Sequence, residues 1–167
     1  TRQDISLLSK NALLENEGRI LKGDTLYYER NIGFGRASSN VELIDTTQNI
    51  IMKGNRALYY EEEGLATLTD SAMMIQIDGL DSLFIHADTL QSVNDTMSTT
   101  DSKILLAYHH VKIFRQDIQG MCDSLAYIED DSIFHLFGAP VLWADENQLT
   151  ASKIELQTKN DQMYRLY

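Results

Sequence analysis

The feature that most constrains the fold of this chain is a short motif that recurs five times at nearly even spacing. Its two most similar copies are KGDTLYYER, residues 22–30, and KGNRALYYE, residues 53–61. Three weaker copies begin at Ala87, Cys122 and Ala151. Each copy contains an apolar anchor, and these anchors, separated by 32, 32, 35 and 29 residues, are Leu26, Leu58, Leu90, Leu125 and Ile154. Spacing of this kind is typical of stacked repeats, in which each repeat covers the apolar face of its neighbour.

The segments between the anchors have the pattern of β-strands. Turn sequences such as ERNIG, EEEG and EDD follow the anchors, and a second set that includes DTTQN and RQDIQG falls midway between them. Apolar residues alternate at period two between the turns, as at Val41 and Leu43. The single proline, Pro140, is in keeping with uninterrupted strand ladders. The pattern predicts an all-β chain of long, stacked antiparallel strands with repeats of roughly 32 residues.

Two local features leave alternatives open. The second copy of the motif has one more residue between its Gly and its Leu than the first copy has, and a β-bulge could absorb this residue. The segment DISLLSKNALLENEG, residues 4–18, has irregular apolar spacing that fits a short helix or a frayed strand equally well.

Composition and charge narrow the possible classes of protein. A chain of 167 residues with 43% hydrophobic residues can bury a core as a single domain over residues 1–167, with residues 1–19 as an irregular or partial first repeat. Its 14 Lys and Arg against 25 Asp and Glu do not indicate a nucleic-acid-binding surface. Cys122, the only cysteine, is expected to be a small buried side chain. No apolar run reaches the length of a membrane-spanning helix, and an export signal is not expected within this chain.

No arrangement of residues is typical of an enzyme or of a metal site. His86 and His135 are isolated in the sequence, and the adjacent His109 and His110 are expected to point to opposite faces of a strand, which prevents them from sharing a metal ion. The sequence lacks the nucleophile elbow of hydrolases, the end of a phosphate-binding loop and the spacing of a calcium loop. We therefore expect no catalytic residues, no metal and no cofactor.

The repeat resembles that of the OstA-like family of lipopolysaccharide-transport proteins, the LptA type. Residues 149–156, LTASKIEL, and 85–92, IHADTLQS, match the first half of the family's repeat. Residues 137–142, FGAPVL, and 38–43, SSNVEL, match the second half, so that the resemblance covers about residues 20–167. The chain departs from the family pattern where Arg56 and Ser152 replace the aspartate, and where Gln91 and Ser92 follow Leu90 in place of the expected tyrosine.

The resemblance implies an elongated, open β-jellyroll in the periplasm whose apolar interior holds the acyl chains of lipopolysaccharide. It also implies that edge strands join the domain end to end with other lipopolysaccharide-transport proteins or with further copies of itself. The terminal segment QMYRLY is expected to provide such an edge. The alternative, from another functional class, is a structural β-repeat interaction domain with a fully packed interior.

Strand alternation identifies the residues expected to face the lipid. Each buried CH₂ group contributes about 0.8 kcal/mol, so an apolar groove can hold acyl chains without specific polar contacts. The expected lipid-binding residues are Leu26, Tyr28, Val41, Leu43, Leu58, Tyr60, Ile75, Leu90, Val111, Ile113, Leu125, Tyr127, Val141, Ile154 and Leu156. The same residues would also form the core of a closed sandwich. A group of basic residues could meet lipid phosphates or form an ordinary solvated face: Lys22, Arg30, Arg36, Lys53 and Arg56.

Overall fold

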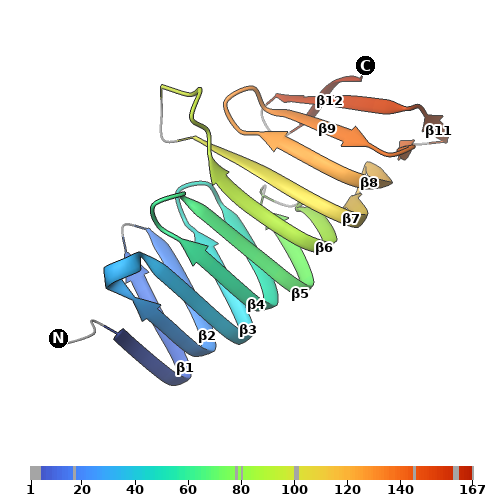
Figure 1. Cartoon of the computed structure of the whole chain (residues 1–167). Helices are drawn as coiled ribbons and strands as arrows, with labels where there is room; N and C mark the ends of the chain where they lie inside the picture. The colour runs from blue at the N-terminus through green and yellow to red at the C-terminus, as the bar shows by residue number, and fades with distance from the viewer. Residues whose placement is uncertain are drawn as a thin grey trace.

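The chain forms one continuous antiparallel sheet in which the long strands follow one another in sequence order (Figure 1). The computed structural model describes residues 5–16, 18–77, 79, 81–99, 102–144, 146–159 and 162–166. The strands are β1 (Ile5–Asn16), β2 (Arg19–Glu29), β3 (Phe34–Asp45), β4 (Ile50–Tyr60), β5 (Leu65–Gln76), β6 (Leu83–Asn94), β7 (Lys103–Arg115), β8 (Ile118–Ile128), β9 (Ile133–Phe137), β10 (Val141–Ala144), β11 (Asn147–Thr150), β12 (Lys153–Lys159) and β13 (Gln162–Leu166). A 3₁₀ turn, Arg30–Ile32, joins β2 to β3.

This architecture confirms the predicted fold class, an open all-β jellyroll of stacked antiparallel strands. The first segment, which the sequence left open between helix and strand, is the strand β1, and it pairs with β2. The predicted turns at residues 29–33, 61–64 and 129–131 separate consecutive strands. One repeat of the sequence therefore corresponds to two strands and the hairpins that join them.

Each long strand is interrupted near its middle by a step at which the chain changes direction. In alternate strands this step is a pair of residues with left-handed backbone conformation, and these pairs are Lys10–Asn11, Ser39–Asn40, Asp70–Ser71, His109–His110 and, between β9 and β10, Gly138–Ala139. The pairing register shifts at the same points. Two successive left-handed residues break the alternation of a strand and bend it, as a bulge does. The steps line up from strand to strand and form a crease that divides the sheet into two walls.

The recurring motif marks this crease on the remaining strands. Asp24 and Asp88 follow the small residue of the motif, and each lies beside a left-handed residue of a neighbouring strand. Asn40 Nδ2 donates a hydrogen bond to Asp24 Oδ2 over 3.0 Å, and His110 Nδ1 lies 2.8 Å from Asp88 Oδ2. Asp123 has the same role beside His109, with 3.3 Å between Oδ1 and Nδ1. The polar residue of the motif therefore stabilises the crease through a side-chain contact.

The expectation that His109 and His110 point to opposite faces is wrong. Both residues have positive φ, 63° and 51°, and both side chains are exposed. Strict alternation holds only for extended backbone, and these two residues form the crease itself.

The apolar anchors form a row that crosses the sheet from strand to strand. Cross-strand pairing connects, in order, Leu26, Ala37, Ala57, Leu68, Leu90, Ala107, Leu125, Leu136 and Ile154. We call this set the anchor row. Four of the five predicted anchors belong to it, but the second copy contributes Ala57 and not Leu58. The crease takes two residues in both copies, Gly23–Asp24 and Gly54–Asn55, so the copies align from the glycine without an inserted residue.

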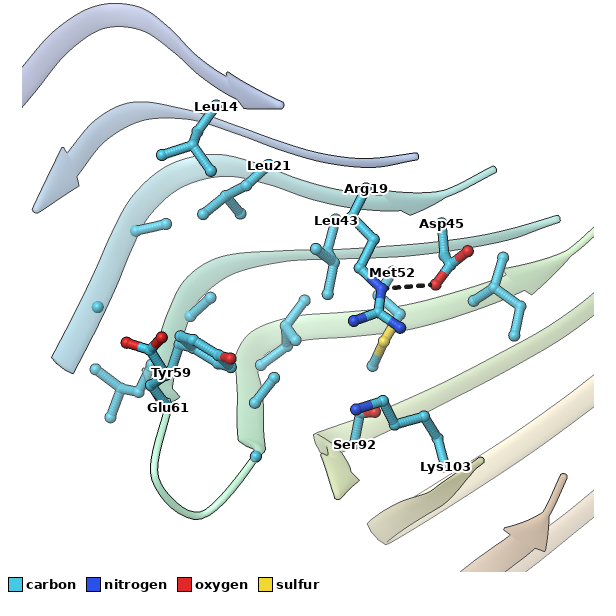
Figure 2. A pocket seen from close by; sticks show the side chains of 18 of the residues that line it. Leu14, Arg19, Leu21, Leu43, Asp45, Met52, Tyr59, Glu61, Ser92 and Lys103 are labelled. Carbon is cyan, nitrogen blue, oxygen red and sulfur yellow. Dashed lines mark hydrogen bonds and ion pairs between the residues drawn. The ribbon is translucent and has the colours of Figure 1, made fainter. Parts of the chain in front are cut away.

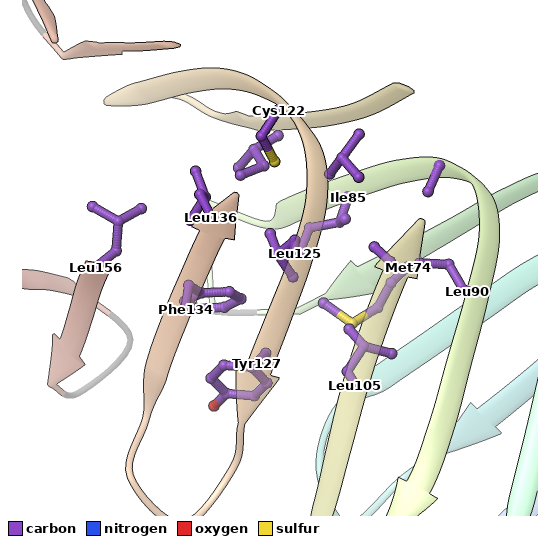
Figure 3. Close-up of a cluster of buried hydrophobic side chains, with 14 of the residues drawn as sticks. Met74, Ile85, Leu90, Leu105, Cys122, Leu125, Tyr127, Phe134, Leu136 and Leu156 are labelled. Atoms are coloured by element: carbon purple, nitrogen blue, oxygen red, sulfur yellow. The ribbon is translucent and has the colours of Figure 1, made fainter. Parts of the chain in front are cut away.

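The two walls pack closely against each other in the C-terminal part of the sheet (Figure 3). Leu90, Leu125 and Leu136 are almost completely buried there. The rings of Tyr127 and Phe134 stack with their centroids 4.2 Å apart. Cys122 is buried near the crease, as the sequence predicted, and this burial raises the pKa of its thiol to about 11.

We predict that Gly138→Ala destabilises the protein much more than Gly79→Ala. Both glycines have positive φ, which costs an L-residue about 1 kcal/mol. A Cβ at Gly138 would also lie 2.4 Å from Asp123 Cβ, whereas a Cβ at Gly79 meets nothing within 4 Å. The expected losses of unfolding free energy are about 3 kcal/mol and about 1 kcal/mol, measured by urea unfolding. Equal losses would show that the crease tolerates this crowding.

Candidate functional site

A cavity of about 450 Å³ lies between the two walls, mainly over strands β2 to β5 (Figure 2). Its volume is in the range of roughly 300–1,000 Å³ that is typical of pockets for small ligands. The apolar residues that border it include Leu14, Leu21, Leu26, Ala37, Leu43, Ile50, Met52, Ala57, Leu68, Met74, Leu105 and Tyr127. The interior is therefore not packed uniformly, because space remains between the walls on the N-terminal side.

Side-chain size along a second transverse row explains where this space lies. Cross-strand pairing connects, in order, Tyr28, Gly35, Tyr59, Ala66, Ser92, Leu105, Tyr127, Phe134 and Leu156, which we call the filling row. Gly35, Ala66 and Ser92 leave the interior open at β3, β5 and β6. From Leu105 onward the row contains only large apolar residues, and the walls are packed together there. The cavity is the part of the interior where this row is small.

Exposure of the inward side chains shows which end of the cavity is open. Leu14, on the edge strand β1, is 47% exposed, whereas Met52 is 4% and Met74 only 1% exposed. Leu21 and Leu43 are half-buried between them. The cavity is therefore most accessible from the side of β1 and is closed toward β7 and β8.

Polar groups lie at the two rims of the cavity, where the strands end. At one rim Arg19 Nε lies 3.1 Å from Asp45 Oδ2 (Figure 2). At the other rim the Tyr28 hydroxyl donates a hydrogen bond to the Glu61 carboxylate, and Lys103 and Glu129 also border the opening. Such an arrangement suits an amphiphile, because an apolar body can enter the interior while its polar group stays at the rim.

Asp45 is the most constrained of the rim carboxylates. Burial alone would raise its pKa, but hydrogen bonds from the Thr47 hydroxyl, from the backbone N–H groups of Gln48 and Thr47 and from Arg19 outweigh that effect. The pKa of Asp45 therefore lies below its ordinary value. The carboxylate orders the turn after β3 as well as pairing with Arg19.

The structure divides the residues expected to bind lipid into three groups. Leu26, Tyr28, Leu43, Leu58 and Tyr127 border the cavity. The fully or almost fully buried members pack away from it in the core, and these are Val41, Leu90, Val111, Ile113, Leu125, Ile154 and Leu156. Strand alternation directs the remaining three side chains to the outer faces of the walls, and these are Tyr60, Ile75 and Val141.

The inward orientation expected for those three residues is wrong for two reasons. Counting the second copy of the motif from its leucine shifted the strand by one residue, so Tyr59 occupies the position in the filling row that was expected for Tyr60. Ile75 follows Met74 and Val141 precedes Leu142, and both of these apolar neighbours are buried in the core. Where consecutive residues are all apolar, period-two counting does not distinguish the faces.

Several residues that border the cavity were not identified from the sequence, among them Leu21 and Met52. The sequence does contain a signal for them, because Leu21 lies two residues before Gly23 and Met52 two residues before Gly54. Residues two apart in a strand share a face of the sheet. Ala66 and Leu105 were missed because their importance comes from their shared cross-strand neighbour Ser92, and the repeat alone does not reveal that register.

The basic residues of the first two repeats have the contacts of a surface ion-pair row. Lys22 and Lys53 flank Glu42, with Nζ–Oε distances of 3.5 Å and 2.8 Å. The Arg36 guanidinium lies over the ring of Tyr27, 5.5 Å from its centroid. Lys22, Glu42 and Lys53 do not border the cavity, whereas Tyr27 and Arg36 are among the residues that line it.

Among the described residues, no three His, Cys, Asp or Glu side chains come together in a way that could hold a metal ion. The described residues also contain no helix with the length and hydrophobicity of a membrane span.

Asp45→Asn is expected to lower the free energy of unfolding by about 1–2 kcal/mol near neutral pH, because the amide cannot form the charged pair with Arg19. A carboxylate with a lowered folded-state pKa stabilises the protein above its unfolded pKa of about 3.9, and this contribution is lost as the pH falls through the folded pKa. The difference between wild type and variant should therefore disappear in acid. Urea unfolding over a range of pH tests this, with the exposed turn variant Asp131→Asn as control; a difference that does not change with pH would contradict it.

Comparison with known proteins supports the fold described above. No protein-family model and no curated protein sequence matches the chain. Among solved structures it is similar to LptH, the LptA homologous periplasmic component of the conserved lipopolysaccharide transport device from Pseudomonas aeruginosa. The TM-score is 0.54 and the sequence identity 12%, over 82% of this chain and 84% of that one. This chain therefore has an LptA-like β-jellyroll fold.

Proposed function

We propose that this chain is a noncatalytic carrier of lipopolysaccharide in the periplasm, and that its cavity holds acyl chains of lipid A. The observation that supports this most directly is the apolar cavity with polar rims, in a fold shared with a periplasmic lipopolysaccharide-transport component. We treat residues 1–167 as one functional unit, because a single sheet connects β1 to β13.

The lining of the cavity provides enough free energy for lipid binding without catalytic or cofactor chemistry. Burial of roughly ten CH₂ groups contributes on the order of 8 kcal/mol before the cost of association is subtracted. We assign acyl-chain contacts to the expected residues that border the cavity, Leu26, Tyr28, Leu43, Leu58 and Tyr127. Leu21 and Met52 are added to them from the structure.

The charge of the protein determines where the headgroup of the lipid can lie. The chain has a formal net charge of −11, and the turns at 61–63 and 129–131 are entirely acidic. Phosphates are repelled by such turns, particularly at low ionic strength. We therefore place the phosphorylated sugars outside the cavity, nearer to the rim that contains Arg19.

The ends of the sheet support the second part of the proposal, that domains join end to end. The sheet begins at β1 and ends at β13, and each of these strands has an edge without a partner within the described residues. Leu7 on β1 is 65% exposed and Leu13 is 54% exposed, with no proline in the strand. Natural proteins protect such edges, and unprotected ones add strands from other chains. The predicted edge segment QMYRLY includes β13, while Tyr167 lies outside the described residues.

Lipid contact can be tested by photocrosslinking at two adjacent positions in β3. A photoreactive amino acid at Leu43, which borders the cavity, should form an adduct with lipopolysaccharide in cells that produce it. The same amino acid at Ile44 lies on the outer face and should not. Adducts at neither position, in protein that is folded and exported, would contradict the proposal and favour a structural interaction domain.

End-to-end joining predicts association that depends on concentration and on β1. Leu7→Lys places a charge beside the exposed edge and should lower the association constant at least tenfold, because charged residues block strand addition. Ile77→Lys changes an exposed apolar residue away from that edge and should have no effect. Sedimentation velocity at several protein concentrations measures both variants. A wild type that remains monomeric, or equal effects of the two variants, would refute joining through β1.

A further inference from the structure

We infer that Leu105 and Tyr127 form an end wall to the cavity, and that this wall limits the length of the acyl chain that can be bound. The inference depends on the proposed lipid-binding function and adds to it a specific selectivity. It also separates the sheet into a lipid-binding part, β1 to β6, and a packed supporting part that begins at β7.

The end wall consists of large, buried side chains that follow directly on the small ones of the filling row. Ser92 of β6 pairs with Leu105 of β7, which pairs with Tyr127 of β8. Both border the cavity and both are almost completely buried, at 6% and 9% exposure. An acyl chain extending along the row therefore meets closely packed side chains at this point.

The wall is supported from behind, so that it is not a flexible gate. The ring of Phe134 stacks on that of Tyr127 at an interplanar angle of 21°, and Leu156 follows Phe134 in the row (Figure 3). Leu125 and Leu136 fill the adjacent anchor row and are 2% and 0% exposed. Movement of Tyr127 would disturb this core, because protein interiors are packed at the density of organic crystals.

The open end and the closed end together define the direction of the bound chain. The inward residues are exposed near β1 and buried near β7, so an acyl chain enters from the β1 side or between the rims. Its methyl end then points toward Leu105. A cavity of about 450 Å³ closed in this way holds a limited number of methylene groups and excludes longer chains.

The wall can be tested by measuring how affinity depends on chain length. The probes are saturated fatty acids from octanoate to stearate, which displace a fluorescent apolar dye from the wild-type chain. Affinity should rise by about fourfold for each added methylene until the chain reaches the wall, and then stop rising. Leu105→Ala should move this plateau to longer fatty acids, and Ala66→Leu should move it to shorter ones.

Two matched variants separate the wall from general effects of mutation. Leu142→Ala removes the same atoms from the packed core away from the cavity, and Ala126→Leu adds the same atoms to the outer face. Neither should move the plateau. If Leu105→Ala does not fold, Ala66→Leu still decides the question, because it fills open space and does not leave a hole.

The possible outcomes distinguish this inference from the function on which it rests. A wild type that binds none of the fatty acids would contradict the lipid-binding function, and the wall with it. Binding with a plateau that neither Leu105→Ala nor Ala66→Leu moves would overturn the wall while leaving the carrier function intact. A plateau that moves equally in the control variants would also overturn it.

Discussion

The structure depends on one backbone constraint, the two-residue left-handed step at the middle of alternate strands. Left-handed φ is tolerated best by Gly, Asn, Asp and His, and most of the residues at these steps are of such types, as at Asn40, Asp70 and His110. Because the steps coincide, a sheet that would otherwise be open and twisted folds along a crease into two walls. The walls face each other, so the interior needs no second sheet and no helix to cover it.

The volume of the inward side chains determines which part of the space between the walls is packed and which part is open. Gly35 and Ala66 belong to the filling row together with Tyr127 and Phe134. This one row therefore borders the cavity at one end and forms part of the core at the other. Burial of the large residues stabilises the C-terminal part of the sheet, and the small residues leave space for an apolar ligand at the other end. The packed core and the open cavity therefore lie on different strands of the same sheet, and the strands around the cavity do not need to fill the space between the walls.

The fold could be predicted from the sequence because its signals are local. Turn residues, alternation and the repeated motif each lie within a few residues, and every copy repeats the same information. The orientation of side chains was harder to predict, since the crease changes the count within a strand and Ile75 lies in the apolar run Met73 to Ile75. The cavity could not be predicted at all from periodicity. It depends on residues such as Gly35 and Ala66, which come close to one another only through the register of the sheet.

The central claim is that lipid occupies the interior at the N-terminal end and not the packed core. Methyl-labelled protein bound to lipopolysaccharide would test it most directly, through nuclear Overhauser effects between side-chain methyls and acyl chains. The account predicts contacts to the methyls of Leu21, Leu43 and Met52, and none to those of Leu136 and Leu142. Contacts spread over the outer face, or no contacts to the three cavity residues, would contradict it.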